Sequence, residues 1–387
     1  MTAADVVVVG LGAMGSATLY QLARRGVRAI GVDRFTPPHD RGSSHGESRI
    51  TRQAIGEGEE YVPFVLRSHE IWRELEAESG DQLLFPIGGL VMGRTARDAR
   101  HHGRDDFVGR TIAAAARYGI AHEVLSAAEV THRFPQFRLA GDEIAYYEPG
   151  AGFVAPERCI QTQLAAAQAR GATVRTGENV TRIHPLPAGV EVVTDRERLT
   201  AGHVVVTAGA WIPGLLGGPF VKLLGVYRQV LYWFAPEDPA PYAPGRFPIF
   251  IWIHGAGEGE YFYGFPIVSA GVKLGAEQFA ETTDPDEVVR DVSAAEVGAV
   301  YATHVRDRLA GVSARCLRAQ ACLYTVAPDS RFIVDRHPDF ERIVVASPCS
   351  GHGFKHSSAI GEAIAQRVTE GRSRLDLGPF ALARFAG

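Results

Sequence analysis

The feature that most constrains this chain is a glycine-rich turn between two apolar strands near its start. Residues 6–9 are four consecutive valines, and residues 10–15 follow them with Gly-x-Gly-x-x-Gly spacing. Residues 16–25 have the apolar pattern of a helix, and residues 27–32 predict a second strand that ends at Asp33. Strand, glycine turn, helix, strand and acid together predict a dinucleotide-binding βαβ unit.

Each residue type in this unit has a physical reason. Gly10 permits a tight turn, Gly12 lets the backbone approach a pyrophosphate, and Gly15 lets the helix and strand pack closely. The helix N-terminus offers unpaired N–H groups to the phosphates. Asp33 is placed to accept a hydrogen bond from a ribose hydroxyl, and its charge would repel a 2′-phosphate, which disfavours NADP. The motif fits FAD and NAD equally, so the identity of the cofactor has to be inferred from the rest of the chain.

Length and composition narrow the class of protein. A chain of 387 residues predicts two domains. A hydrophobic content of 46% with 22% charged residues is typical of a globular protein with a large core, and a net charge of −4 gives no sign of nucleic-acid or membrane-surface binding. No apolar run approaches the roughly 18 residues of a membrane span, and the first strand leaves no room for a signal peptide. The four cysteines show neither C-x-x-C pairing nor zinc spacing, so we expect no metal site and a cytoplasmic protein.

The apolar strand followed by a small-residue turn recurs twice. Residues 203–211 and residues 343–355 both run from a buried-looking strand into glycines, and a helix follows each. Nucleotide-binding pieces therefore occur at the start, middle and end of the chain. This pattern favours two interleaved domains over an N-terminal NAD module followed by a catalytic domain.

Other segments carry weaker predictions. Residues 37–46 form a polar, Gly/Ser-rich loop whose small residues suit close approach to a ligand. The residues after this loop, 47–52, are compatible with a helix. Further helices are predicted over residues 61–80, 105–118, 126–133, 156–170, 284–302 and 358–370.

Seven motifs spread over the whole length carry a specific resemblance. The chain resembles the monomeric sarcosine oxidase and N-methyltryptophan oxidase family of flavoenzymes, within the wider glycine oxidase and D-amino-acid oxidase group. The matching segments are 10–15 with Asp33, 42–46 with Arg49 and Arg52, 207–211, 263–266, 273–275, 322–325 with 328–329, and 350–355.

The resemblance implies an α/β fold in which a Rossmann-like FAD-binding domain is interleaved with an α+β substrate domain that carries a mixed sheet. Residues 1–60, 150–212 and 318–387 are expected in the FAD-binding domain, and residues 61–149 and 213–317 in the substrate domain.

FAD is the implied cofactor, often attached through a cysteine thioether. Cys322 matches the linking cysteine by its Cys-x-Tyr-Thr context, and Cys349 is its rival because it adjoins the last glycine turn. Both are alternatively small buried side chains, which is the usual state of a free cysteine. The expected cofactor contacts are Gly10, Gly12, Gly15, Asp33, Arg34, Ser43, Ser44, Val180, Gly209, Trp211, Cys322, Gly351, Gly353, Phe354 and Lys355.

The resemblance also assigns roles around the flavin ring. Arg52 and Lys355 match a clamp for the substrate carboxylate, which suits a bidentate guanidinium and a point charge. Lys273 matches the lysine that activates O2, where a cation stabilises developing negative charge. Arg49 and His45 match positions that tune the flavin, and Tyr263 matches an active-site tyrosine.

One position departs from the family pattern. Glu277 stands four residues after Lys273, where sarcosine oxidase carries a histidine. A carboxylate there would alter amine recognition, favour a second cationic group, or pair with a neighbouring base. We therefore place Glu277 among the substrate-binding residues and leave the preferred amine open.

The implied reaction is oxidation of the C–N bond of a secondary amino acid by O2, giving an imine, then formaldehyde, and hydrogen peroxide. A small amino acid and O2 are the expected partners of a monomer. Three alternatives stay open: an oxidase of a cyclic imino acid or of a bulkier N-substituted amino acid, an FAD dehydrogenase that uses an electron carrier, and a non-catalytic flavin-binding protein. The choice between hydride and radical transfer also stays open.

Overall fold

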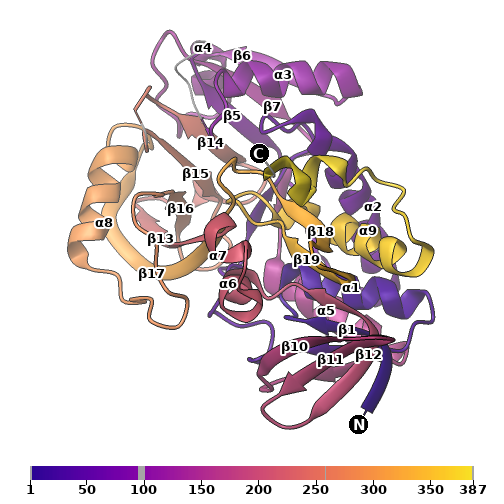
Figure 1. The fold of residues 1–387 in the computed structure, drawn as a ribbon. Helices are drawn as coiled ribbons and strands as arrows, with labels where there is room; N and C mark the ends of the chain where they lie inside the picture. Colours follow the sequence, from indigo (N-terminus) through magenta and orange to yellow (C-terminus); the bar gives the residue numbers. More distant parts are fainter. Residues whose placement is uncertain (1, 95–100, 258, 386–387) are drawn as a thin grey trace.

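The computed structural model describes residues 2–94, 101–257 and 259–385. Two large sheets occupy opposite ends of the molecule in Figure 1, and helices α1, α2, α5 and α9 gather along one side. Within the described residues, the helices are too short or too polar to cross a membrane.

The first sheet is built around β1 (Thr2–Val9), which pairs in parallel with β2 (Ala29–Val32) and β12 (Arg198–Val206). Because β1 is buried in the middle of this sheet, an unbroken valine run suits it. The glycine turn leads from β1 into α1 (Ala13–Arg24), as the sequence predicts. The remaining strands are β9 (Thr173–Arg175), β10 (Val180–Leu186), β11 (Gly189–Thr194), β18 (Ile333–His337) and β19 (Phe340–Ser347).

The second sheet has eight strands in the order β17-β13-β16-β15-β14-β5-β7-β6. Its pairs are antiparallel except for the parallel pair of β14 and β5, so the sheet is mixed, and the predicted α/β fold class is confirmed. In sequence order the strands are β5 (Gly89–Gly93), β6 (Glu123–Ser126), β7 (Ile144–Glu148), β13 (Gly225–Pro236), β14 (Ile249–Ile253), β15 (Tyr261–Phe265), β16 (Val272–Ala276) and β17 (Val312–Val326).

The chain passes between the sheets more than once. The first sheet takes strands from residues 2–32, 173–206 and 333–347, and the second from residues 89–148 and 225–326. A third, short sheet consists of β3 (Arg49–Thr51), β8 (Gly152–Val154) and β4 (Leu84–Pro86), in the order β3-β8-β4. The residue boundaries expected for the two domains stay a prediction.

Most predicted helices are found within a residue or two of their expected ends. A capping box of Ser126 and Glu129 starts the short fourth helix, because each side chain satisfies a backbone N–H group of the other. The helices concerned are α2 (Val62–Ser79), α3 (Phe107–Tyr118), α4 (Ala127–Arg133), α5 (Pro156–Ala169) and α9 (Ser357–Glu370).

Two helix predictions are wrong. Residues 49–51 form strand β3, because pairing with β8 satisfies their backbone groups. In the segment predicted as a helix over 284–302, the α-helix α8 covers only Ala294–Val300, and one π-helical turn (Tyr301–Val305) follows it. Pro285 disfavours helical backbone at the residue before it, and a capping box at Ser293 starts the helix later.

The glycine turn is packed against β12 without room for side chains. Gly10 has a φ of +87°, and a Cβ built on Gly15 would lie 1.7 Å from the Gly10 carbonyl oxygen. The Thr207 hydroxyl donates to that same oxygen at 2.7 Å. Gly15 therefore lets α1 approach both the turn and the end of β12.

We expect Gly15→Ala to lower stability, because its methyl group meets backbone atoms that cannot move aside. The cost should be about 1–3 kcal/mol or more, measured as a drop in the thermal unfolding midpoint. The matched control is Gly298→Ala in α8, where a Cβ meets nothing within 4 Å. That change should leave the midpoint unchanged or raise it, and an equal drop in both variants would contradict this account of Gly15.

Candidate functional site

One cavity of about 830 Å³ runs from the glycine turn to the turn after β19. Of the fifteen cofactor contacts expected from the sequence, twelve line this cavity: Gly10, Gly12, Asp33, Arg34, Ser43, Ser44, Val180, Gly209, Trp211, Gly351, Gly353 and Phe354. The other three, Gly15, Cys322 and Lys355, do not line it in the described structure.

The end of the cavity at α1 suits a dinucleotide. Gly12 is the N-cap of α1, and within the described chain no side chain caps that helix start, so its first N–H groups and positive dipole end are available to phosphate. A Cβ on Gly12 would meet only the Ser44 hydroxyl, at 3.8 Å. On the cavity wall, the buried Ser347 hydroxyl has no hydrogen-bond partner among the described residues.

Asp33 is fixed by backbone groups at the end of β2. Its Oδ2 accepts from the Leu11 N–H at 2.7 Å, and its Oδ1 accepts from the Phe35 N–H at 2.7 Å. Burial raises the pKa of this carboxyl, and both hydrogen bonds oppose the rise. The carboxylate is therefore held rigidly on the cavity wall, as a ribose contact requires.

The start of the segment predicted as a helix over residues 284–302 lines the cavity instead. Asp286 accepts hydrogen bonds from Arg34 at 2.7 Å and from the Trp211 indole at 2.9 Å. The N–H of Thr283 donates to the Val226 carbonyl at 2.8 Å, and residues 282–286 line the cavity. Asp286 thus ties together two residues expected to contact the cofactor. The helical pattern around it concealed this role.

Lys273 is buried on β16 and does not line the cavity in the described structure. Its ammonium group donates to the Gly46 carbonyl at 2.6 Å, the Ser48 carbonyl at 2.7 Å and the Ser48 hydroxyl at 3.0 Å. Burial, together with the Arg49 charge, lowers the pKa of this lysine well below its usual value. These contacts fix the loop before β3, and the predicted role with O2 stays a prediction.

Arg49 and His45 lie in the same loop. Arg49 borders the cavity and donates to the Ser43 carbonyl at 2.8 Å. His45 is buried, and neither ring nitrogen has a hydrogen-bond partner among the described residues. Burial and the neighbouring Arg49 and Lys273 charges lower the pKa of His45 to about 3, so the ring is neutral. Two unpaired polar atoms beside the cavity loop fit a site that a polar ligand completes.

Cys322 and Tyr324 belong to one buried cluster, and Cys349 packs against it. Burial raises the pKa of the Cys322 thiol to about 11, while the Arg49 and Lys273 charges oppose the rise. Cys349 lines the cavity, and its Sγ accepts from the Thr325 N–H at 3.5 Å. Tyr324 also lines the cavity, and its hydroxyl lies 3.3 Å from that of the predicted Tyr263. The Cys-x-Tyr-Thr motif contains this tyrosine, but nothing in the motif alone indicates a role for its hydroxyl.

Arg52 and Lys355, the expected carboxylate clamp, converge on Glu57. Arg52 Nη2 lies 2.5 Å from one Glu57 oxygen, and Lys355 Nζ lies 3.9 Å from the other. All three side chains are at most 5% exposed. Burial opposes ionisation of Glu57, but the two cations hold its pKa well below the usual value. Burial also lowers the pKa of Lys355 to about 7, although Glu57 counteracts part of the effect.

His102 joins this group to Glu277. Its Nδ1 lies 3.4 Å from Glu57 Oε1, and its Nε2 lies 3.0 Å from Glu277 Oε2. Burial alone would lower the pKa of His102, but the two carboxylates raise it to about 9, so the ring is a cation at neutral pH. The sequence missed Glu57 and His102, because no motif surrounds them and only the fold brings them to Glu277.

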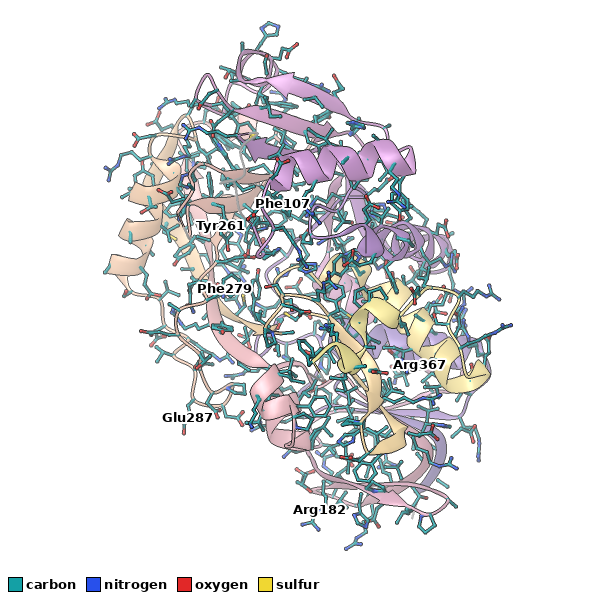
Figure 2. The ribbon with its side chains drawn as sticks, turned by 45° about the horizontal axis from the view of Figure 1, so that its top comes forward. Phe107, Arg182, Tyr261, Phe279, Glu287 and Arg367 are labelled. Atoms are coloured by element: carbon teal, nitrogen blue, oxygen red, sulfur yellow. The ribbon has the colours of Figure 1, made fainter. Side chains whose placement is uncertain are left out.

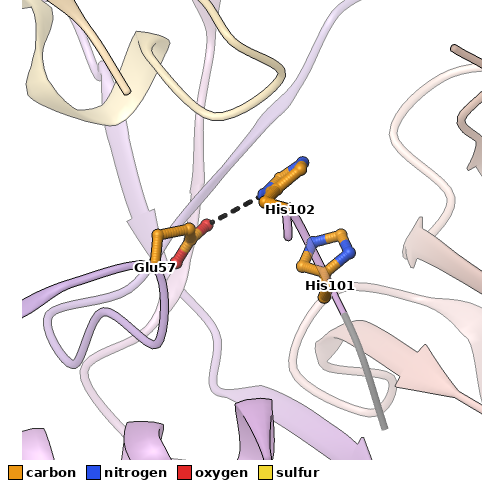
Figure 3. Close-up of side chains that lie close together, drawn as sticks. All are labelled: Glu57, His101 and His102. Atoms are coloured by element: carbon orange, nitrogen blue, oxygen red, sulfur yellow. Dashed lines mark ion pairs between the residues drawn. The ribbon is translucent and has the colours of Figure 1, made fainter. Parts of the chain in front are cut away.

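The neighbouring His101 holds this loop in place. Its ring packs against Phe107 at 4.7 Å and against Tyr261 at 4.5 Å between centroids, and Figure 2 shows Phe107 and Tyr261 close together. Figure 3 shows Glu57, His101 and His102, whose potential ligand atoms lie within 4.8 Å of one another. Because Arg52 and Lys355 already neutralise Glu57, we interpret this group as an ion-pair network and assign it no metal.

With Lys355 protonated, the buried network carries an excess of one positive charge. Arg52, His102 and protonated Lys355 contribute three positive charges, and Glu57 and Glu277 contribute two negative ones. The network adjoins the cavity at Gly351, where a built Cβ would lie 2.8 Å from His102 Nε2. This end of the cavity therefore suits an anion of unit charge, such as a carboxylate.

The fold and site define an α/β protein with a cavity suited to a dinucleotide and a buried network of ionised side chains that adjoins this cavity at Gly351. Residues 5–367 match the family model described as FAD dependent oxidoreductase, and the chain belongs to that family. The flavoenzyme group predicted from the sequence is confirmed.

Two curated relatives match over almost their full length. The chain is 37% identical to a monomeric sarcosine oxidase of Streptomyces avermitilis, covering 99% of this chain and 98% of that protein. It is 34% identical to an N-methyl-L-tryptophan oxidase of Yersinia pestis, covering 98% and 99%. Among solved structures, NikD, described as an unusual amino acid oxidase essential for nikkomycin biosynthesis, is 26% identical with a TM-score of 0.85, covering 98% of each chain.

The pKa of Lys355 predicts pH-dependent anion binding. Below pH 7 the lysine is charged, and above pH 7 it loses the proton that an anion needs. We expect the affinity of the holoprotein for acetate, which stays ionised, to fall by about tenfold in total between pH 6 and 8, because most of the Lys355 side chains lose their proton over this range. Flavin absorbance changes measure it. Lys355→Met should bind acetate weakly without this pH dependence, and a wild-type affinity that is equal at pH 6 and 8 would refute the assignment.

Proposed function

We propose that this protein uses FAD and O2 to oxidise the C–N bond of a secondary, N-methyl amino acid. The products are an imine, which water converts to formaldehyde and the amino acid, and hydrogen peroxide. The observation that carries the proposal is the convergence of Arg52 and Lys355 on the Glu57 carboxylate, which His102 connects to Glu277 and to the cavity wall at Gly351. Relatives named for sarcosine and N-methyl-L-tryptophan support the same substrate class.

Each residue expected near the flavin ring has a role in the proposed reaction. Bound FAD would accept the electron pair from the substrate. Arg52 and Lys355 would hold the substrate carboxylate and so orient the neighbouring amine. Lys273 would supply positive charge for O2 reduction, and neutral His45 and Arg49 would complete the polar surroundings of the ring. Because a relative is named as monomeric, we propose a monomer as well. The cytoplasmic location expected from the sequence stays a prediction.

We further propose that FAD is attached covalently through Cys322. A thioether requires the thiolate form, and the Arg49 and Lys273 charges favour the Cys322 thiolate against its burial. Cys349 lies on the cavity wall, and the Thr325 N–H and the Arg49 charge favour its thiolate against burial as well, so the choice between the two cysteines rests on sequence context. Cys322 also has the family's motif context.

The reaction is tested with purified holoprotein and a small panel of amines. Sarcosine or N-methyl-L-tryptophan should bleach the flavin without oxygen, and in air each formaldehyde formed should accompany one peroxide. Lys273→Met should still be bleached but should be reoxidised about 100-fold more slowly or worse. Bleaching by L-proline alone would support a cyclic imino-acid oxidase. Bleaching without peroxide in air would support a dehydrogenase, and no bleaching by any amine would refute catalysis.

Intact mass tests the attachment site. The wild-type protein should carry the added mass of one FAD and stay yellow after acid precipitation. Cys322→Ser should release its flavin into the supernatant, whereas the matched variant Cys349→Ser should keep it. Retention by Cys322→Ser together with release by Cys349→Ser would move the linkage to Cys349, and release by the wild type would exclude a covalent bond.

A further inference from the structure

Glu277 is a buried carboxylate that the proposed reaction does not yet use. It follows directly after β16, and its side chain is 3% exposed. Its Oε2 accepts hydrogen bonds from the Tyr261 hydroxyl at 2.9 Å and from His102 Nε2 at 3.0 Å. Both of these hydrogen bonds go to one oxygen, so they hold the carboxylate in one orientation, and within the described residues no hydrogen bond is recorded to its Oε1.

The surroundings keep this carboxylate ionised. Burial raises the pKa of Glu277, but the His102 charge and the hydrogen bonds from His102 and Tyr261 outweigh burial and lower it. The adjacent His101 contributes little charge, because burial and His102 lower its pKa well below the usual value. Glu277 and His102 therefore form an imidazolium–carboxylate pair at neutral pH.

The second oxygen of Glu277 points to the cavity end. A Cβ built on Gly351 would lie 3.3 Å from Glu277 Oε1 and 3.2 Å from the ring of Tyr324. Gly351 and Tyr324 both line the cavity. A side chain at Gly351 would therefore separate Glu277 from the cavity, and the glycine leaves the approach open.

The charge of Glu277 acts both on the carboxylate clamp and on the side chains around Tyr324. It counteracts the fall in the pKa of Lys355 that burial causes. It also adds to the effect of burial in raising the pKa of Tyr263, Tyr324 and Cys322. An amino acid whose carboxylate lies on Arg52 and Lys355 carries its amine only two bonds away from that carboxylate carbon.

We propose that Glu277, positioned by His102 and Tyr261, binds the positively charged nitrogen of the amino-acid substrate. This inference rests on the proposed function, because it needs the substrate carboxylate on Arg52 and Lys355. The site then recognises a zwitterion with one anionic and one cationic subsite, and it discriminates against neutral carboxylates of the same shape. Glu277 is a specificity-determining residue, and His102 is its positioning residue.

Two ligands of one shape test the charge recognition directly. Glycine betaine and 3,3-dimethylbutanoate both carry a carboxylate and three methyl groups, and they differ only by a cationic nitrogen in place of a carbon. Their Kd values are measured on the holoprotein from flavin absorbance. Glu277→Gln should raise the Kd of betaine at least tenfold relative to that of 3,3-dimethylbutanoate, whose own Kd should change less than threefold.

The control is Glu143→Gln. Glu143 is a buried carboxylate outside the network, and it accepts a hydrogen bond from the indole of Trp252 on the second sheet at 2.8 Å. This substitution should leave both Kd values unchanged. If Glu277→Gln does not fold, Glu277→His replaces it, with the same expected loss of betaine preference. His102→Gln should also reduce that preference, because it removes the cation that keeps Glu277 ionised.

An unchanged betaine preference in the Glu277 variant would overturn the inference, and so would an equal loss for both ligands or no binding of either ligand to the wild-type protein. Turnover of N-methyl amino acids is measured separately and does not enter these Kd values. A protein that turns over sarcosine without betaine preference would retain the proposed reaction and lose only this inference.

Discussion

The structure depends on a buried chain of alternating charges. Arg52, Glu57, His102 and Glu277 follow one another at 2.5, 3.4 and 3.0 Å. An unpaired charge in such a place would cost several kcal/mol, so each member requires its neighbours. The four residues come from the segment after β3, the loop before α3 and the end of β16. Meeting this electrostatic requirement fixes three distant parts of the chain against one another.

The two ends of the cavity are surrounded by different kinds of chemical group. At the dinucleotide end, backbone N–H groups and glycines form the surface, and side chains mostly hold the backbone in place, as Thr207 holds Gly10. At the other end, the neighbouring side chains are titratable groups whose pKa values are shifted by burial and by each other. Substitutions there can therefore change the local charge without altering the backbone groups at the dinucleotide end.

The sequence predicts best those features that depend on interactions between residues close together in the chain. The turn at 10–15 and the helices with capping residues are local, so their patterns were sufficient. Residues 49–51 became a strand because β8 pairs with them, and Asp286 acquired its role from Arg34 and Trp211. Likewise, nothing near His102 in the sequence indicates its two carboxylate partners, because Glu57 and Glu277 belong to distant segments of the chain. At position 277 the sequence shows only a departure from the family pattern, whereas the partners of Glu277 are apparent from the fold.

The interleaving of segments also has a consequence for biosynthesis. The wall of the cavity includes the glycine turn near residue 10 and the turn at residues 346–354, and strand β19, which leads into that later turn, pairs with β12. Chains emerge from the ribosome N-terminus first. A nascent chain thus exposes its phosphate-binding turn long before it can enclose a cofactor. A flavin can therefore be enclosed fully only after residues 346–354 have been synthesised.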